Sequence, residues 1–178
     1  MKKNILLLAV AIMMGIASAE AQVVAEQRFV VPQHNITNAA NCKPYNHAIL
    51  ECTHWLENVS PNIYKGEQEE AKKFLTVWST LSEDVSIVMD EKIVSFMNSS
   101  PDMIIYYIGG WTRKSIQTKN KLFKSDYAYA GLQSVMNYYK RYNKLVKYDA
   151  NIEKLIELEK NGGLLIQLQK DMINYDFK

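Results

Sequence analysis

Apolar residues recur every three or four positions along most of the chain after residue 44. This spacing is typical of amphipathic α-helices, because one face of a helix repeats every 3.6 residues. The clearest example is the segment 67–81, which opens with acidic and amide side chains that suit the positive end of a helix dipole. Its apolar positions are Ala71, Phe74, Leu75, Trp78 and Leu81. We therefore predict a helix over 67–81 with this face buried.

Six further segments show the same spacing, together with residues that begin or end helices. The expected helices cover residues 44–58, 90–98, 101–111, 126–143, 149–160 and 164–173. Either Asp149 or Asn151 can cap the start of the helix that ends near residue 160, and the string Asn161-Gly162-Gly163 can supply a left-handed residue after it. Because the links are short, the pattern predicts an all-α fold, an antiparallel helical bundle or array of six or seven helices.

Glycines inside the expected helices leave two alternatives open. The pair Gly109-Gly110 either ends the helix over 101–111 or allows it to pack closely against a neighbour. Gly131, within the helix over 126–143, likewise permits a close helix contact.

The first 21 residues have the pattern of an export signal. Lys2 and Lys3 precede an apolar run over 5–16 that is too short to span a bilayer. Small residues for cleavage occur at 17–19 and 19–21, and we favour the second, which leaves Gln22 as the new terminus. The processed protein is then expected to be periplasmic or extracellular. Residues 22–43 are expected to form an extended N-terminal strap and residues 44–178 a single helical domain, with no further transmembrane segment.

Charge is balanced overall but unevenly distributed. The chain has 21 Lys and Arg against 19 Asp and Glu; the expected signal peptide contains Lys2, Lys3 and Glu20, so its removal leaves 19 against 18. Such a balance argues against nucleic acid as a partner. Residues 111–147 nevertheless carry nine basic side chains and one acid, Asp126. This basic segment is the strongest electrostatic feature of the sequence.

Two cysteines remain after the expected cleavage, Cys42 and Cys52. An exported protein meets an oxidising compartment, so we expect one intramolecular disulfide between them. Such a bridge would stabilise the fold by about 2–3 kcal/mol. A zinc site built from these cysteines with His47 and His54 is disfavoured, because close Cys-x-x-Cys pairs are missing.

His47, Glu51 and His54 are spaced so that all three share one side of a helix. Their Glu-x-x-His pattern is found in di-metal helical bundles. Helical angles place the three side chains opposite the apolar side, and a second Glu-x-x-His is missing. We therefore expect a solvent-exposed polar face and no metal or other cofactor, with a metal-dependent enzyme as the alternative.

Aromatic residues accompany the basic segment. Cations beside tyrosine rings can hold a phosphorylated or sugar ligand. The predicted ligand-binding residues are Arg113, Lys114, Tyr138, Lys140, Arg141 and Lys144. A solvated helix face that complements the acidic first half of the chain is the structural alternative.

These features favour a monomeric binding module over an enzyme. The sequence has neither a Gly-x-Ser-x-Gly nucleophile elbow nor a phosphate-binding glycine loop. We predict no catalytic residue, and an anionic envelope ligand or a protein as the partner. An envelope immunity or inhibitor protein that neutralises a toxin is a further alternative.

Several short strings resemble a group of small exported helical proteins of Bacteroidota without an assigned activity. They are Ile108-Gly109-Gly110-Trp111, then Ala130-Gly131-Leu132 followed by Val135 and Tyr138-Tyr139-Lys140, then Leu155, Leu158 and Gly163-Leu164. The resemblance covers roughly residues 44–170 and rests on packing motifs. It implies an all-helical envelope protein and transfers no catalytic residue.

Overall fold

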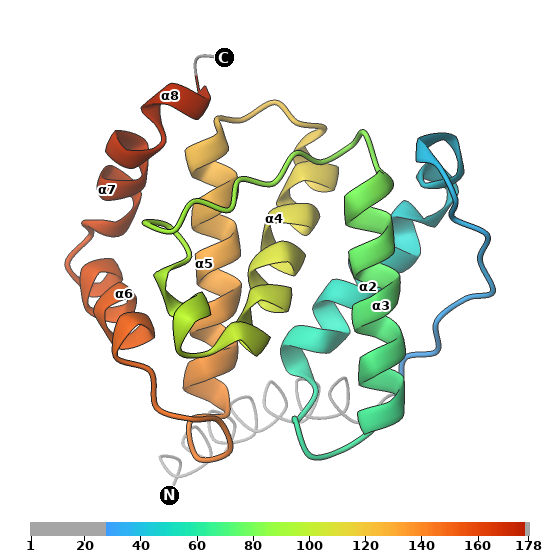
Figure 1. Cartoon of the computed structure of the whole chain (residues 1–178), viewed down its shortest axis with the longest axis horizontal. Helices are drawn as coiled ribbons and strands as arrows, with labels where there is room; N and C mark the ends of the chain where they lie inside the picture. The colour runs from blue at the N-terminus through green and yellow to red at the C-terminus, as the bar shows by residue number, and fades with distance from the viewer. Residues whose placement is uncertain (1–27, 177–178) are drawn as a thin grey trace, which may run out of the picture.

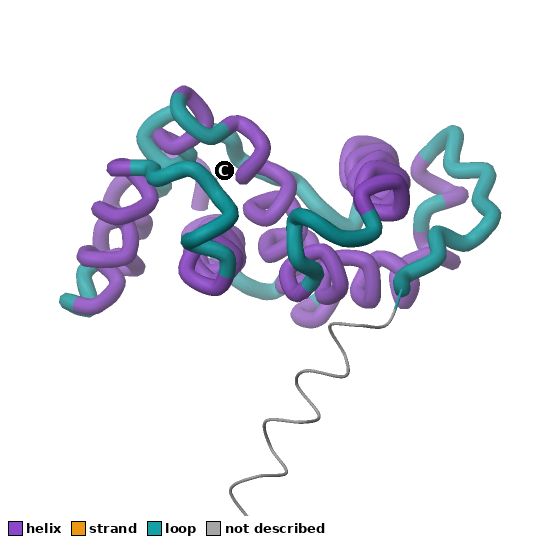
Figure 2. Tube along the Cα trace, turned by 90° about the horizontal axis from the view of Figure 1, so that it is seen from below, coloured by secondary structure: helices purple, strands orange, loops and turns teal. Residues whose placement is uncertain are grey.

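The computed structural model describes residues 28–176, which fold into seven α-helices without a β-strand (Figure 1). The predicted all-α fold class is therefore confirmed. The predicted signal peptide and the first part of the predicted strap lie outside the described residues. Figure 2 shows the helices distributed along the long axis of the molecule and joined by loops.

Four longer helices form the body of the fold: α2 (Asn46–Asn58), α3 (Lys65–Leu81), α4 (Ile104–Thr118) and α5 (Lys124–Arg141). The pair α4 and α5 lies in the centre, and α2 and α3 pack on one side of it (Figure 1). The other side of α5 is covered by α6 (Ala150–Lys160), α7 (Leu164–Asp171) and α8 (Ile173–Asp176). The basic segment therefore belongs to the central pair and to the loop after it.

Residues 28–38 run without regular secondary structure before two 3₁₀ turns, Ala39–Asn41 and Lys43–Tyr45. The ring of Phe29 lies 5.8 Å from that of Trp55 on α2. Ile36 is buried. The apolar side chains of this segment thus pack on the helical body, while the full strap over 22–43 stays a prediction because it includes residues that are not described.

The crossing of α4 and α5 requires glycine on both helices. A Cβ atom at Gly110 would lie 2.4 Å from the carbonyl oxygen of Ala130 and 2.9 Å from Cα of Gly131. A Cβ atom at Gly131 would lie 2.6 Å from the ring of Tyr107. Because the backbones approach so closely, a side chain at either position would force the helices apart. Helix α4 accordingly continues through its glycine pair to Thr118, and the alternative in which it ends there is wrong.

Large aromatic side chains fill much of the core. Trp78, Phe74, Tyr107 and Trp111 are almost completely buried. The rings of Tyr107 and Trp111 lie 5.8 Å apart, in the tilted geometry that aromatic pairs prefer. The apolar face predicted from helical spacing on α3 is the face that the structure buries, with Leu81 only partly covered.

The connection between α3 and α4, residues 82–103, crosses in front of α4 and α5 in Figure 1. The helix predicted over 90–98 is wrong, since only Ser95–Asn98 forms a 3₁₀ turn. The Asp90 side chain accepts a bond from the backbone N–H of Lys92, as the cap of a helix would, but the chain that follows forms only turns. The helix expected from residue 44 begins at Asn46, because Pro44 lies in the 3₁₀ turn that precedes α2.

The predicted disulfide is also wrong, because Cys42 and Cys52 are both free and buried. The thiol of Cys42 lies 4.0 Å from the carbonyl oxygen of Trp78, and that of Cys52 lies 3.4 Å from the carbonyl oxygen of Ala71. These carbonyls are seven residues apart on α3, which is roughly 10 Å of helix rise. The thiols therefore contact different turns of α3 and cannot reach the roughly 2 Å separation of a bridge.

The two adjacent glycines of α4 provide a matched test of the crossing. We expect Gly110→Ala to lower the free energy of unfolding by about 2 kcal/mol or more, because its Cβ meets backbone atoms that cannot move independently. Gly109→Ala should raise it by up to about 1 kcal/mol, since its Cβ would meet only ordinary contacts at 3.6–3.7 Å and alanine favours a helix. Urea unfolding followed by circular dichroism measures both, and equal stability of the two variants would contradict the crossing.

Candidate functional site

The six side chains predicted to bind a ligand do not form one site. Arg113 and Lys114 belong to α4, whereas Tyr138, Lys140 and Arg141 lie near the C-terminal end of α5. Lys144 follows in the α5–α6 loop, residues 142–149. Of these side chains, Arg113 and Tyr138 are engaged in contacts inside the protein, and Lys114 is half-buried.

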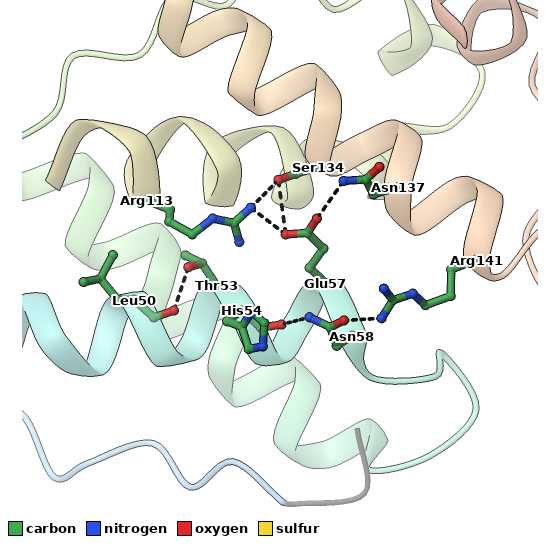
Figure 3. A network of polar contacts seen from close by, with 9 residues as sticks. All are labelled: Leu50, Thr53, His54, Glu57, Asn58, Arg113, Ser134, Asn137 and Arg141. Atoms are coloured by element: carbon green, nitrogen blue, oxygen red, sulfur yellow. Dashed lines mark hydrogen bonds and ion pairs between the residues drawn. The ribbon is translucent and has the colours of Figure 1, made fainter. Parts of the chain in front are cut away.

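Arg113 is held by a carboxylate from another helix (Figure 3). Its Nη2 lies 2.6 Å from Oε2 of Glu57 on α2 and donates to the hydroxyl of Ser134 on α5 at 3.0 Å. Asn137 of α5 donates to the second carboxylate oxygen. The side chains of Glu57 and Arg113 are 12% and 25% exposed, so water screens the pair only partly. This network joins α2, α4 and α5 and engages Nη2 of the guanidinium inside the protein.

Tyr138 is buried against a second tyrosine, Tyr106 of α4. The two rings are stacked with their centroids 3.8 Å apart. The ring of Tyr142 lies against that of Tyr138, with the centroids 4.8 Å apart. Burial raises the pKa of both Tyr106 and Tyr138 above the usual tyrosine range. The hydroxyls therefore stay protonated at neutral pH and can hydrogen-bond but not act as bases.

The remaining basic residues gather where α5 ends. Lys140, Lys144 and Lys147 are exposed and form no ion pair with any residue that the structure describes. Arg141 is exposed as well, and it donates to the side-chain oxygen of Asn58 at the end of α2 (Figure 3). Cations at a helix C-terminus interact favourably with the negative end of its dipole. We call Lys140, Arg141, Lys144 and Lys147 the basic end of α5. Three of them, Lys140, Arg141 and Lys144, are among the predicted ligand-binding residues.

A cleft of about 420 Å³ lies beside the basic end of α5. The stacked rings of Tyr106 and Tyr138 line it, together with parts of α3, residues 99–103 and the α5–α6 loop. Its charged lining residues are Glu69, Lys72, Asp102 and Lys147, of which Glu69 and Lys72 form an ion pair at 2.8 Å. This tyrosine cleft therefore combines aromatic surface with charges of both signs.

The α5–α6 loop that borders the cleft is anchored by a buried carboxylate, Asp149. Its side chain caps α6 by accepting the backbone N–H groups of Asn151 and Ile152 at 2.8 and 3.2 Å. It also accepts the hydroxyl of Ser99 at 2.5 Å, and its own N–H donates to the hydroxyl of Tyr139. The expected capping role of Asp149 is thus confirmed, and the structure adds that this cap ties the loop to residues 99–100 and to α5.

The pKa of Asp149 reflects two opposing effects. Burial raises the pKa, whereas hydrogen bonds from the hydroxyls of Ser100 and Ser99 and from two backbone N–H groups lower it. The hydrogen bonds together have the larger effect, so the net pKa lies below that of a free aspartate. The carboxylate is 1% exposed and charged at neutral pH. Hydroxyl and backbone N–H donors stabilise its negative charge, and these hydrogen bonds hold the turn in place.

His47, Glu51 and His54 are all exposed on the outer side of α2. The Nδ1 atom of His47 lies 3.7 Å from Oε2 of Glu51, as an (i, i+4) pair. Within residues 28–176, no group of three His, Cys, Asp or Glu side chains is arranged to hold a metal ion. The structure therefore gives the metal-dependent alternative no assembled site.

Sequence reasoning missed Tyr106, Asp102 and Glu57. Adjacent residues of a helix are rotated by about 100° relative to each other, so the tyrosine doublets at 106–107 and 138–139 place neighbouring rings against different partners. Periodicity assigned Tyr107 and Tyr139 to the core but gave no reason to pair Tyr106 with Tyr138. The Glu57–Arg113 ion pair joins residues far apart in the chain, and single-sequence charge patterns carry no signal for it.

No family model, curated protein or solved structure was found to match the chain. The function is therefore inferred from the site itself.

Replacing Arg113 tests its structural role. Arg113→Met should lower the free energy of unfolding by about 2–3 kcal/mol, because it leaves the Glu57 carboxylate largely buried without its cation. The double variant Glu57→Leu/Arg113→Met should recover most of this loss. Chemical denaturation gives the values. Lys160→Met, which breaks the exposed pair with Glu157, is the control and should change stability by less than about 0.5 kcal/mol.

Removing the charge of Asp149 tests the anchor of the loop. Since the folded pKa is lowered, the carboxylate contributes stability above the unfolded pKa, which is about 3.9, and this contribution disappears as the pH falls through the folded value. Asp149→Asn should therefore cost about 1–2 kcal/mol at pH 7, and the difference from the wild type should shrink below about pH 4. Denaturation at several pH values measures this, with the exposed Asp102→Asn as control; a pH-independent difference would refute the assignment.

Proposed function

We propose that the protein is an exported, non-catalytic binding protein that acts in the periplasm or outside the cell. Its binding surface consists of the basic end of α5, the α5–α6 loop and the tyrosine cleft, and its ligand is an anionic envelope component. The observation that carries this proposal is that Lys140, Lys144 and Lys147 stand exposed, without an intramolecular ion pair among the described residues, next to a cleft lined by tyrosines.

A binding role fits the chemistry of this surface. Like charges crowded at one end of a molecule repel one another, and an anion that binds there relieves the repulsion. Tyrosine hydroxyls are neutral at neutral pH and can both donate and accept hydrogen bonds, and Tyr106 and Tyr138 line the cleft. The rigid turn closed by Asp149 lowers the entropy that binding would otherwise cost.

The basic residues at the two ends of α5 form separate groups. The loop over 119–123 also belongs to the basic segment, but it lies at the N-terminal end of α5 (Figure 1). An 18-residue helix separates the two ends by roughly 27 Å. One small ligand cannot contact both groups of lysines, so we assign binding to the C-terminal end, where the cleft lies.

Charge reversal tests the proposal with a matched control. The triple variant Lys140→Glu, Lys144→Glu, Lys147→Glu should lose at least about 100-fold in affinity for inorganic polyphosphate, measured by isothermal titration calorimetry at low salt. The control Lys119→Glu, Lys121→Glu, Lys170→Glu makes the same change in net charge at exposed sites elsewhere and should lose much less. Equal losses, or no binding by the wild type, would refute the proposed surface.

A further inference from the structure

We propose that the anionic ligand is a membrane surface, and that the α5–α6 loop docks on anionic lipid headgroups. This inference rests on the proposed function and names the ligand of the same surface. The loop alternates basic and apolar residues that both face water: Lys144 and Lys147 are exposed, and so are Leu145 at 51% and Tyr148 at 70%. A site for a small soluble anion has no need of exposed leucine and tyrosine side chains, whereas a bilayer interface accommodates both.

The loop holds these side chains in a defined arrangement. The backbone N–H groups of Leu145 and Val146 donate to the carbonyl oxygen of Tyr142 at 2.8 and 3.0 Å. The hydroxyl of Tyr142 donates in turn to the carbonyl oxygen of Asn58 on α2. Val146 packs against the core, and Asp149 closes the loop at its far end. Because the turn is already ordered, little further conformational entropy is lost when its exposed apolar side chains enter a lipid interface.

A second loop contributes to the same end of the molecule. Pro61, in the connection between α2 and α3, lines the tyrosine cleft together with Leu145. Ile63, two residues further on, is 42% exposed. Both loops lie at the lower edge of Figure 1. Pro61 and Leu145 thus bring the two loops to one cleft, and the exposed apolar side chains of both loops lie at the same end of the molecule.

Charge complementarity selects an anionic bilayer over a neutral one. Of the acids that line the cleft, Glu69 is paired with Lys72, which leaves Asp102 against the four cations of the basic end of α5. Each lysine near an anionic leaflet strengthens binding about five-fold. Long lysine side chains can extend along apolar surface and keep their charge among the headgroups while leucine enters deeper. Within residues 28–176, no helix is long and apolar enough to cross a bilayer, and interfacial docking needs none.

The test separates docking on a membrane from binding of any anion. The protein is purified after removal of its leader and mixed with vesicles of phosphatidylglycerol and phosphatidylcholine, or of phosphatidylcholine alone, and bound protein is measured by co-sedimentation. We expect binding to the anionic vesicles only. Leu145→Ser/Tyr148→Ser should lower this binding about 100-fold, roughly ten-fold per side chain, and should lower polyphosphate binding much less, because neither side chain carries a charge. The control Ile166→Ser/Ile173→Ser removes residues that are 55% and 54% exposed on α7 and α8 and should bind vesicles like the wild type.

Each outcome bears on one claim. Binding of polyphosphate without binding of anionic vesicles overturns the membrane inference and leaves the proposed function standing. Vesicle binding that survives the loop substitutions, or falls equally in the control, overturns the role of the loop. If the wild type binds neither polyphosphate nor anionic vesicles, both claims are refuted. Because all four replaced side chains are exposed, circular dichroism should show unchanged folding of both variants.

Discussion

The close approach of α4 and α5 is the constraint on which the rest of the structure depends. Where Gly110 meets Gly131, the backbones touch without side chains between them, and Tyr107 packs directly on the second glycine. This contact fixes the distance and angle of the two central helices. The other helices then pack against a rigid pair, with α2 and α3 on one side and α6 to α8 on the other. A glycine contact of this kind works through shape, since a single methyl group would separate the helices.

The polar contacts around this pair extend its rigidity to the proposed binding surface. Glu57 and Arg113 lock the end of α2 to both central helices, and the next residue, Asn58, receives bonds from Arg141 and Tyr142 where α5 ends. Asp149 then fixes the following loop. The basic end of α5 is therefore supported from three directions. Such support allows exposed lysines and apolar side chains to be presented in a fixed geometry, which is what a binding surface requires.

Much of the architecture could be predicted from local patterns. Helical spacing located α3 and its buried Phe74 and Trp78. Capping preferences gave Asp149 as one of two candidate caps and placed the end of α6 at the string 161–163, in which Gly162 is left-handed. The errors share one cause. The expected disulfide and the expected helix over 90–98 both depended on how α3 and the 82–103 connection lie on the body of the fold, which single-sequence periodicity does not contain. The candidate site shows the same limit, because the sequence marks Tyr138 as a candidate ligand-binding residue but does not show that its ring stacks on Tyr106.

The sequence by itself determined the all-α class, most of the buried helix faces and the concentration of positive charge, because these follow from the order of residue types along one chain. Only the tertiary structure decided which basic residues remain available. It pairs Arg113 with a carboxylate 56 positions away and leaves Lys140, Lys144 and Lys147 in water beside a cleft. The physical reason is that the charge of a side chain is a local property, whereas its partners are set by long-range packing.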